Sequence, residues 1–157
     1  MDPLCLRPIT ETATDADRDS IALIWHQSAG LPEVGVPRLP GLAALRARVD
    51  AELAAGWEVT IAEREGIVVG FLAIRPAEAL LCELFLRPDC RGQGIGTRLL
   101  AYAMTRMPGG FRLFTRPVNT PAIRFYEAAG LRFLSADIHP HFGDRILWYV
   151  WAPDWPA

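Results

Sequence analysis

The stretch LLCELFLRPDCRGQGIGTRLLAYAMTRM, residues 80–107, decides the fold. It opens with Leu80–Leu86, an apolar run of strand length, and continues through a proline and a glycine-rich turn. Apolar residues then recur on one face of a predicted helix, at Ile95, Leu99, Leu100, Ala103, Met104 and Met107. Together these parts predict a phosphate site, because first-turn N–H groups lack intrahelical partners and the helix dipole favours negative charge.

The spacing of the glycines narrows the choice of phosphate ligand. A dinucleotide loop needs G-x-G-x-x-G, and its third glycine would fall at Thr97 or at Leu99, so both frames fail. A Walker loop needs Gly-Lys-Ser/Thr, and the stretch contains no lysine. The two commonest nucleotide-binding loops are therefore excluded.

Composition sets the class of protein. The chain has 157 residues, a net charge of −2 and a pI near 5.9, which predicts one domain over residues 1–157 and no nucleic-acid or membrane partner. Its three cysteines form no C-x-x-C pair, and their odd number argues against a disulfide framework. No basic-then-apolar leader is visible, so the expected location is cytoplasmic.

Hydrophobic periodicity predicts strands and helices in the order β α α β β β α β α β β, an α/β or α+β domain. The expected fold class is a mixed, mostly antiparallel sheet of about seven strands with about four helices. The predicted strands are Leu4–Pro8, 57–62, 67–74, Leu80–Leu86, Phe111–Thr115, 131–136 and Arg145–Trp151. One predicted helix follows Thr14, a second carries Leu42, Leu45, Val49 and Leu53 on one face, a third spans 91–107, and the last starts at Thr120.

Two motifs resemble those of the GNAT N-acetyltransferases. The first is R/Q-x-x-G-x-G/A behind an apolar strand, matched by Arg91, Gly94 and Gly96. The second is N-x-x-A-x-x-F/L-Y-x-x-x-G-F, matched by Asn119, Ala122, Phe125, Tyr126 and Gly130, with Leu131 in place of the final Phe. The motifs have the family's order and separation, and together with the predicted order of strands and helices the resemblance covers essentially the whole chain.

The resemblance implies a sheet that splays between the fourth and fifth strands, with acetyl-CoA as co-substrate in the opening. Backbone groups of Leu84, Phe85 and Leu86 would pair with the pantetheine amides. The pyrophosphate would bind at Arg91, Gly92, Gln93, Gly94, Ile95, Gly96 and Thr97, and Asn119 would lie on the pantetheine or adenine side.

The resemblance also implies direct attack of an amine on the thioester. Tyr126 holds the family's general-acid position, and a tyrosine is protonated at neutral pH. A backbone N–H near Leu84–Phe85 would stabilise the oxyanion. Glu83 is the best carboxylate for a base, with His26 a distant second and a water relay as the alternative. An ordinary glutamate lies about six pKa units below an alkylammonium, so Glu83 would need desolvation or that relay.

The sequence specifies the acceptor amine less closely than the co-substrate. The expectation is a primary amine of a small molecule or amino-acid-like compound; peptide or protein amines, and a non-catalytic acyl-CoA sensor, are the alternatives. The ribosomal-type N-terminal acetyltransferases carry a Glu five residues before the motif Asn, where this chain has Phe114, which argues against that specificity. His139 and His141 have no third ligand at usable spacing, so no metal is expected. A homodimer is left open.

Overall fold

A computed structural model describes residues 3–154 of the chain. Its strands are β1 (Leu4–Pro8), β2 (Glu58–Arg64), β3 (Ile67–Arg75), β4 (Leu80–Leu86), β5 (Phe111–Thr115), β6 (Arg132–Ile138) and β7 (Arg145–Trp151). Its α-helices are α1 (Asp15–Ala29), α2 (Leu42–Ala54), α3 (Ile95–Arg106) and α4 (Thr120–Ala128). Over the described residues, the predicted seven strands and four helices are thus confirmed.

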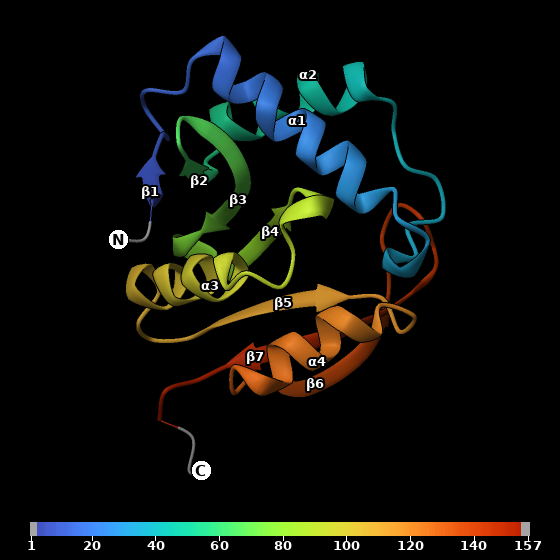
Figure 1. Cartoon of the computed structure of the whole chain (residues 1–157). Helices are drawn as coiled ribbons and strands as arrows, with labels where there is room; N and C mark the ends of the chain where they lie inside the picture. Colours follow the sequence, from blue (N-terminus) through green and yellow to red (C-terminus); the bar gives the residue numbers. More distant parts are fainter. Residues whose placement is uncertain (1–2, 155–157) are drawn as a thin grey trace.

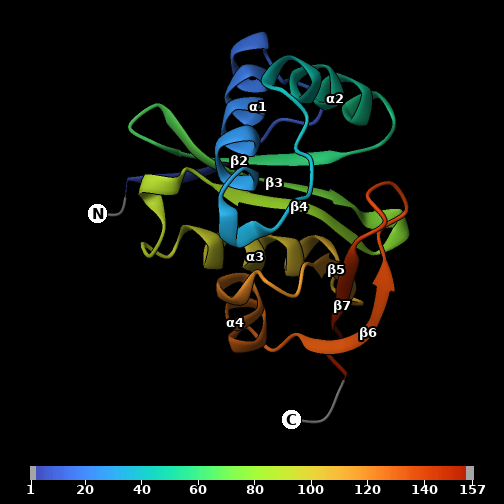
Figure 2. The same ribbon diagram turned by 90° about the vertical axis from the view of Figure 1, so that its right-hand side faces the viewer.

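The seven strands form one sheet in the order β1-β2-β3-β4-β5-β7-β6. Every neighbouring pair is antiparallel except β4 and β5, which run parallel. Helices α1 and α2 lie on one side of the β1–β4 half and α3 lies on the other (Figures 1 and 2). Helix α4 lies beside the half formed by β5, β7 and β6. The predicted mixed, mostly antiparallel sheet is therefore confirmed.

Strands β4 and β5 separate soon after they meet. Their register holds a single pair, Leu80 with Arg112, and the Arg112 N–H donates to the Ala79 carbonyl at 3.0 Å. Beyond this pair the residues of β4 from Cys82 to Leu86 are only half-buried, although β4 lies at the centre of the sheet. The splay predicted between the fourth and fifth strands is therefore present.

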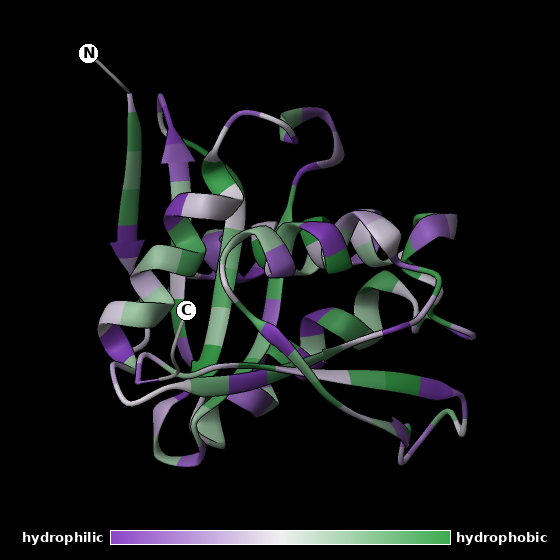
Figure 3. Cartoon of the chain, turned by 90° about the horizontal axis from the view of Figure 1, so that it is seen from below, coloured by the Kyte–Doolittle hydropathy of each residue, from purple (hydrophilic) through white to green (hydrophobic). Residues whose placement is uncertain are grey.

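Two apolar clusters hold the layers together. One joins α3 to both halves of the sheet, and its members include Leu99, Leu113 and Tyr126. The other packs α1 and α2 onto β2 and β3, around Trp25 and Trp57, whose ring centroids lie 5.6 Å apart. Figure 3 shows the central strands coloured mainly as hydrophobic, whereas the helices carry both colours. No helix in residues 3–154 is long and apolar enough to cross a membrane.

The structure moves several predicted boundaries. The helix expected from Arg91 begins at Ile95, because Gly92 and Gly94 adopt positive φ angles of 77° and 83°, which a right-handed helix does not contain. Strand β6 continues to Ile138, two residues beyond the predicted end. Residues 32–34, between α1 and α2, form a 3₁₀ turn that begins at a proline.

Candidate active site

The outer half of β4 presents backbone groups to the space where β5 departs. The Arg87 N–H donates to the Val69 carbonyl of β3 at 2.8 Å. Because N–H groups alternate in direction along a strand, those of Leu84 and Leu86 point to the opposite edge, where β5 is no longer paired. Phe85, by contrast, turns its backbone toward β3. Of the three residues predicted to bind the pantetheine amides, Leu84 and Leu86 are therefore the ones with available N–H groups.

The glycine loop before α3 is exposed and its backbone is free to approach a ligand. Residues 91–94 are all exposed, and a Cβ added to Gly92 or Gly94 would meet no heavy atom within 4 Å. These glycines are required by their positive φ angles rather than by crowding. Helix α3 begins without a side-chain cap, so its first N–H groups are available to donate hydrogen bonds to an anion. This geometry fits a pyrophosphate.

Two side chains of the glycine loop already have partners. The Arg91 guanidinium lies 3.3 Å from the Glu33 carboxylate, and Arg64 donates a hydrogen bond to the Gln93 amide oxygen. The Arg91 side chain is 50% exposed, so its ion pair is one that solvent screens. A phosphate could therefore replace Glu33 as the partner of Arg91 at little cost.

The second motif packs against the first. A Cβ added to Gly96 would lie 3.3 Å from the Phe125 ring, so the glycine allows α3 and α4 to approach closely. Ile95 is fully buried and anchors the first turn of α3, while Thr97 is exposed beside it. Asn119 caps α4, since its side-chain oxygen accepts the Ala122 N–H at 3.3 Å.

Glu83 lies in β4 next to a bulge that leaves Cys82 without an opposite residue on β3. The side chain is half-buried, and desolvation raises its pKa from an ordinary value of 4.5 to about 7. Arg48 and Arg116 oppose this rise, while Glu52 adds to it. A carboxyl group with a pKa near neutrality accepts a proton far more readily than an ordinary glutamate.

Tyr126 is buried on α4 and faces the apolar cluster around α3. Burial raises the pKa of its hydroxyl, and the negative charge of Glu83 raises it further. The charge of Glu83 on β4 thus acts on the hydroxyl of Tyr126 on α4, the other predicted catalytic side chain. Tyr126 is consequently protonated at neutral pH.

Arg48 and Arg116, which act on the pKa of Glu83, were not predicted as site residues from the sequence, and neither were Asp144, which pairs with Arg116, and His139. Arg48 comes from α2, Arg116 follows β5, and His139 and Asp144 belong to the turn between β6 and β7. The pKa of His139 is lowered by burial, Arg116, His141 and Arg48, against the effect of Asp144. Only the turn carried a signal in the sequence, the pair of imidazoles of His139 and His141.

The segment between α1 and α2 reaches the same region. A Cβ added to Gly35 would lie 2.4 Å from a Val118 side-chain carbon and 3.6 Å from the Arg116 Cβ. Figure 2 shows this segment passing in front of the sheet, with the β6–β7 turn beside it. It therefore packs against the residues that follow β5.

Sequence and structural comparisons agree with this geometry. The model of the Acetyltransferase (GNAT) family matches residues 35–131 of the chain. The chain belongs to the GNAT family. Peptidyl-lysine N-acetyltransferase YjaB of Salmonella typhimurium is 43% identical over 49 residues, which make up 31% of this chain and 33% of that protein. The match thus spans only about a third of that curated relative.

Solved structures share the GNAT fold over nearly the whole chain. An acetyltransferase from Thermus thermophilus superposes with a TM-score of 0.74 at 23% identity, covering 97% of this chain and 99% of the other. The Salmonella typhimurium protein yncA, solved with its cofactor acetyl-CoA, gives 0.72 at 17% identity, covering 99% and 97%. At these identities the likeness establishes the fold.

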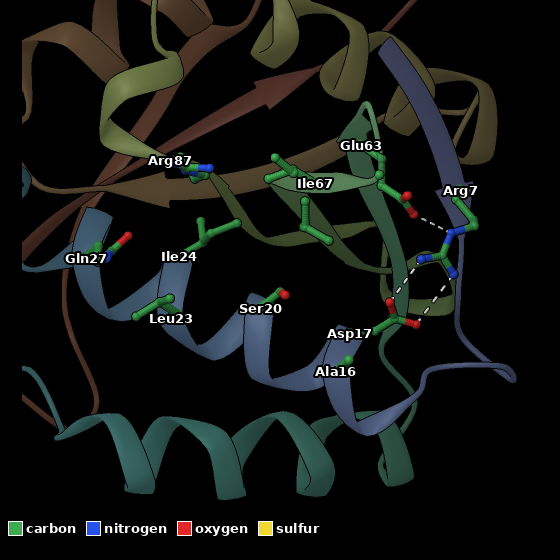
Figure 4. Close-up of a pocket in the computed structure, with 12 residues that line it drawn as sticks. Arg7, Ala16, Asp17, Ser20, Leu23, Ile24, Gln27, Glu63, Ile67 and Arg87 are labelled. Carbon is green, nitrogen blue, oxygen red and sulfur yellow. Dashed lines mark hydrogen bonds and ion pairs between the residues drawn. The ribbon is translucent and has the colours of Figure 1, made fainter. Parts of the chain in front are cut away.

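A groove of about 470 Å³ in this GNAT domain lies away from Glu83, between α1 and the β2–β3 hairpin (Figure 4). Its charged groups bind one another, since Arg7 contacts Asp17 at 2.9 Å and also pairs with Glu63. Asp17 in turn completes the cap of α1 with Thr14. The groove's charges are therefore committed to joining β1, β2 and α1.

Two further predictions concern histidines. His26 lies on α1 and is not among the groups that shift the pKa of Glu83. In residues 3–154, no three His, Cys, Asp or Glu side chains are grouped so that they could hold a metal ion. His139 instead packs in an aromatic group, 5.5 Å from Phe114 and 4.9 Å from Phe142 between ring centroids.

Proposed function

We propose that the protein transfers the acetyl group of acetyl-CoA directly to a primary amine of a small-molecule or amino-acid-like acceptor. The observation that carries this proposal is the separation of β4 from β5 after a single residue pair, with Glu83 on β4 and Tyr126 buried in the cluster that joins the two halves of the sheet. The open edge of β4 and the uncapped glycine loop before α3 support binding of the pantetheine and pyrophosphate. Family membership supports the reaction type.

In the proposed reaction the amine nitrogen attacks the thioester carbonyl, so that a C–N bond forms and the C–S bond breaks. Glu83 takes the proton of the amine, and its raised pKa narrows the gap to an alkylammonium. The Leu84 N–H, on the open edge of β4, donates to the oxyanion. Tyr126 gives a proton to the departing thiolate and regains one from solvent. Glu83 and the nitrogen of the new amide each release one proton to solvent, so that an ammonium and acetyl-CoA yield the amide, CoA thiol and one proton.

The electrostatic coupling of the two groups favours this order of events. While Glu83 is ionised, its charge raises the pKa of Tyr126 and weakens it as an acid. Once Glu83 has accepted a proton from the amine, its negative charge no longer raises the pKa of Tyr126. Tyr126 is then a stronger acid than before, at the stage when the thiolate leaves. Deprotonation of the nucleophile thereby prepares protonation of the leaving group.

The neighbouring thiol argues against a covalent acetyl-enzyme. Burial and the Glu83 charge raise the pKa of Cys82 to about 11. The thiolate is the nucleophile of cysteine chemistry, so Cys82 is almost entirely unreactive at neutral pH. Direct attack by the amine is the remaining route through this part of the site.

Release of CoA thiol in the presence of acetyl-CoA and a panel of amines tests the proposal. The panel contains amino acids, simple alkylamines and a lysine-containing peptide, because YjaB is a peptidyl-lysine enzyme. We expect turnover with one or more small amines. Turnover with the peptide alone would replace the small acceptor by a protein one, and tight acetyl-CoA binding without turnover on any amine would indicate a sensor.

A further inference from the structure

Two arginines from distant parts of the chain lie in the region of Glu83. Arg48 of α2 rests on Trp25, which belongs to the same apolar cluster as Ala73, the β3 residue opposite Glu83. Arg116 follows β5 and packs against the segment between α1 and α2, where a Cβ added to Gly35 would lie 3.6 Å from its Cβ. Both guanidinium groups lower the pKa of Glu83, as nearby positive charges do. Neither is needed for the transfer chemistry described above.

Arg116 is held rigidly. Its Nε donates to Asp144 Oδ2 at 2.8 Å, and its side chain is 11% exposed. Its Cζ lies 5.9 Å from the Phe114 ring centroid and 5.4 Å from that of Phe142. Its Nη2 is buried without a hydrogen-bond partner in residues 3–154, and so is the second carboxylate oxygen of Asp144, Oδ1. A buried donor of this kind costs free energy until a partner accepts from it.

Arg48 is also positioned without a carboxylate partner. Its Cζ lies 5.2 Å from the Trp25 ring centroid, and it forms no ion pair within the described part of the chain. Arg46, two residues earlier on α2, instead donates to Asp19 and Asp50, both at 2.7 Å. Arg48 therefore keeps its N–H donors available while its stem rests on an aromatic ring.

The charges around Glu83 leave an excess of positive charge. Asp144 offsets one of the two guanidinium groups, and His139 is neutral near pH 7 because its pKa is lowered. Glu83 is only partly ionised there, since its pKa is about 7. Glu52 is already paired with Arg75 at 2.9 Å. A polycationic acceptor would be repelled at this site, whereas an anionic group would be attracted.

We propose that the acceptor carries a carboxylate, as an amino acid does, and that Arg48 and Arg116 bind this carboxylate while the amine faces Glu83. The guanidinium group suits a carboxylate because its planar fork can donate two parallel hydrogen bonds. The inference rests on the proposed amine acetylation and names the chemical class of its acceptor. Arg48 and Arg116 are then specificity-determining residues.

The test compares common α-amino acids with their C-terminal amides, which keep the amine and lose the charge. For wild type we expect kcat/KM to favour the acid over its amide by at least about tenfold. Arg48→Met keeps the apolar stem on Trp25 and should reduce this preference about tenfold or more, with little effect on the amides. Arg46→Met, with the same charge change on the same helix, should leave the preference intact.

Arg116 needs a milder substitution because Asp144 would be left half-buried and unpaired. Arg116→Lys retains a cation for Asp144 but removes the planar fork, so the preference should fall while thermal unfolding stays near that of wild type. A lysine variant that folds and keeps the full preference would overturn the role of Arg116.

The remaining outcomes separate this inference from the proposed function. Equal kcat/KM for acids and amides in wild type would overturn carboxylate recognition and leave amine acetylation standing. Preference for phosphoethanolamine over ethanolamine, without preference for amino acids over amides, would replace the carboxylate by a phosphate. Absence of turnover with every amine would instead refute the acetyl transfer on which the inference rests.

Discussion

The Glu33 carboxylate lies 3.3 Å from the Arg91 guanidinium, which joins the segment between α1 and α2 to the glycine loop before α3. Both side chains are partly exposed, so the pair resembles those that contribute little to stability. The pair matters for function because one of its two residues, Arg91, is proposed to bind the pyrophosphate of acetyl-CoA. Binding of acetyl-CoA would exchange one anion for another at Arg91.

Glu33→Gln should therefore increase the affinity for CoA, since Arg91 no longer has to leave a carboxylate. We expect Kd to fall about two- to fivefold at low salt and the difference to shrink as salt screens the exposed charges. Calorimetric titration with CoA measures this, with Glu11→Gln as a control that removes an equal charge elsewhere. Unchanged or weaker binding would mean that Arg91 does not contact the phosphates.

Gly94→Asp should weaken CoA binding by at least about two orders of magnitude, or about 3 kcal/mol, because it places a negative charge at the N-terminus of α3. Gly94→Asn has nearly the same size and tolerates positive φ, so it separates charge from backbone strain and should bind CoA better than the Asp variant. Near-wild-type binding by a folded Asp variant would refute the assignment of the loop.

Tyr126→Phe removes the hydroxyl and keeps the ring in the apolar cluster around α3. We expect kcat to fall about 10²-fold or more, with little change in KM for acetyl-CoA, if Tyr126 protonates the leaving thiolate. Tyr149→Phe is the matched control, because Tyr149 is a buried tyrosine of the same cluster. An unchanged kcat would make Tyr126 a packing residue.

Glu83→Gln should lower kcat/KM for the amine and remove an inflection near pH 7 from its acidic limb, since the pKa of Glu83 is about 7. Glutamine keeps the shape but cannot accept the proton. Rates of thiol release from about pH 5.5 to about pH 9.5 span both that inflection and the approach to the pKa of the amine. Superimposable profiles, rising toward the pKa of the amine, would assign deprotonation to water instead.

The same substitution gives a stability test that needs no acceptor. The raised pKa of Glu83 means that its protonated form is favoured in the folded protein. Its contribution to stability is fully present below about pH 4.5 and is lost as the pH rises to about 7. The Tm of Glu83→Gln relative to wild type should therefore increase over this window and then level off. A difference independent of pH would mean that Glu83 titrates like an exposed carboxylate.

The sequence was sufficient for elements whose pattern is local. The bounds of β4, β5 and β7 match the predicted ones because each is an apolar run between strong breakers. The start of α3 was misplaced since the sequence does not show which glycines adopt positive φ. The glycine loop, Glu83 and Tyr126 were likewise identified from motifs that lie within short segments.

The charge environment of Glu83 could not be predicted in the same way. Arg48 and Arg116 come from α2 and from the end of β5, and only the folded sheet brings them toward Glu83. Asp144, which holds Arg116, belongs to yet another turn. Exposed arginines are common on helices, so nothing in the pattern of α2 distinguishes Arg48 from Arg46.

The single residue pair between β4 and β5 has a consequence for the lifetime of the protein. The two halves of the sheet share almost no backbone hydrogen bonds, and the core around α3 holds them together instead. A ligand bound along the open edge of β4 stabilises the folded state by mass action, by about 2.7 kcal/mol at a concentration about one hundred times its Kd. Resistance to heat and to proteases should then increase with the concentration of acetyl-CoA. A low concentration of the co-substrate would therefore reduce the amount of folded enzyme as well as its rate of turnover.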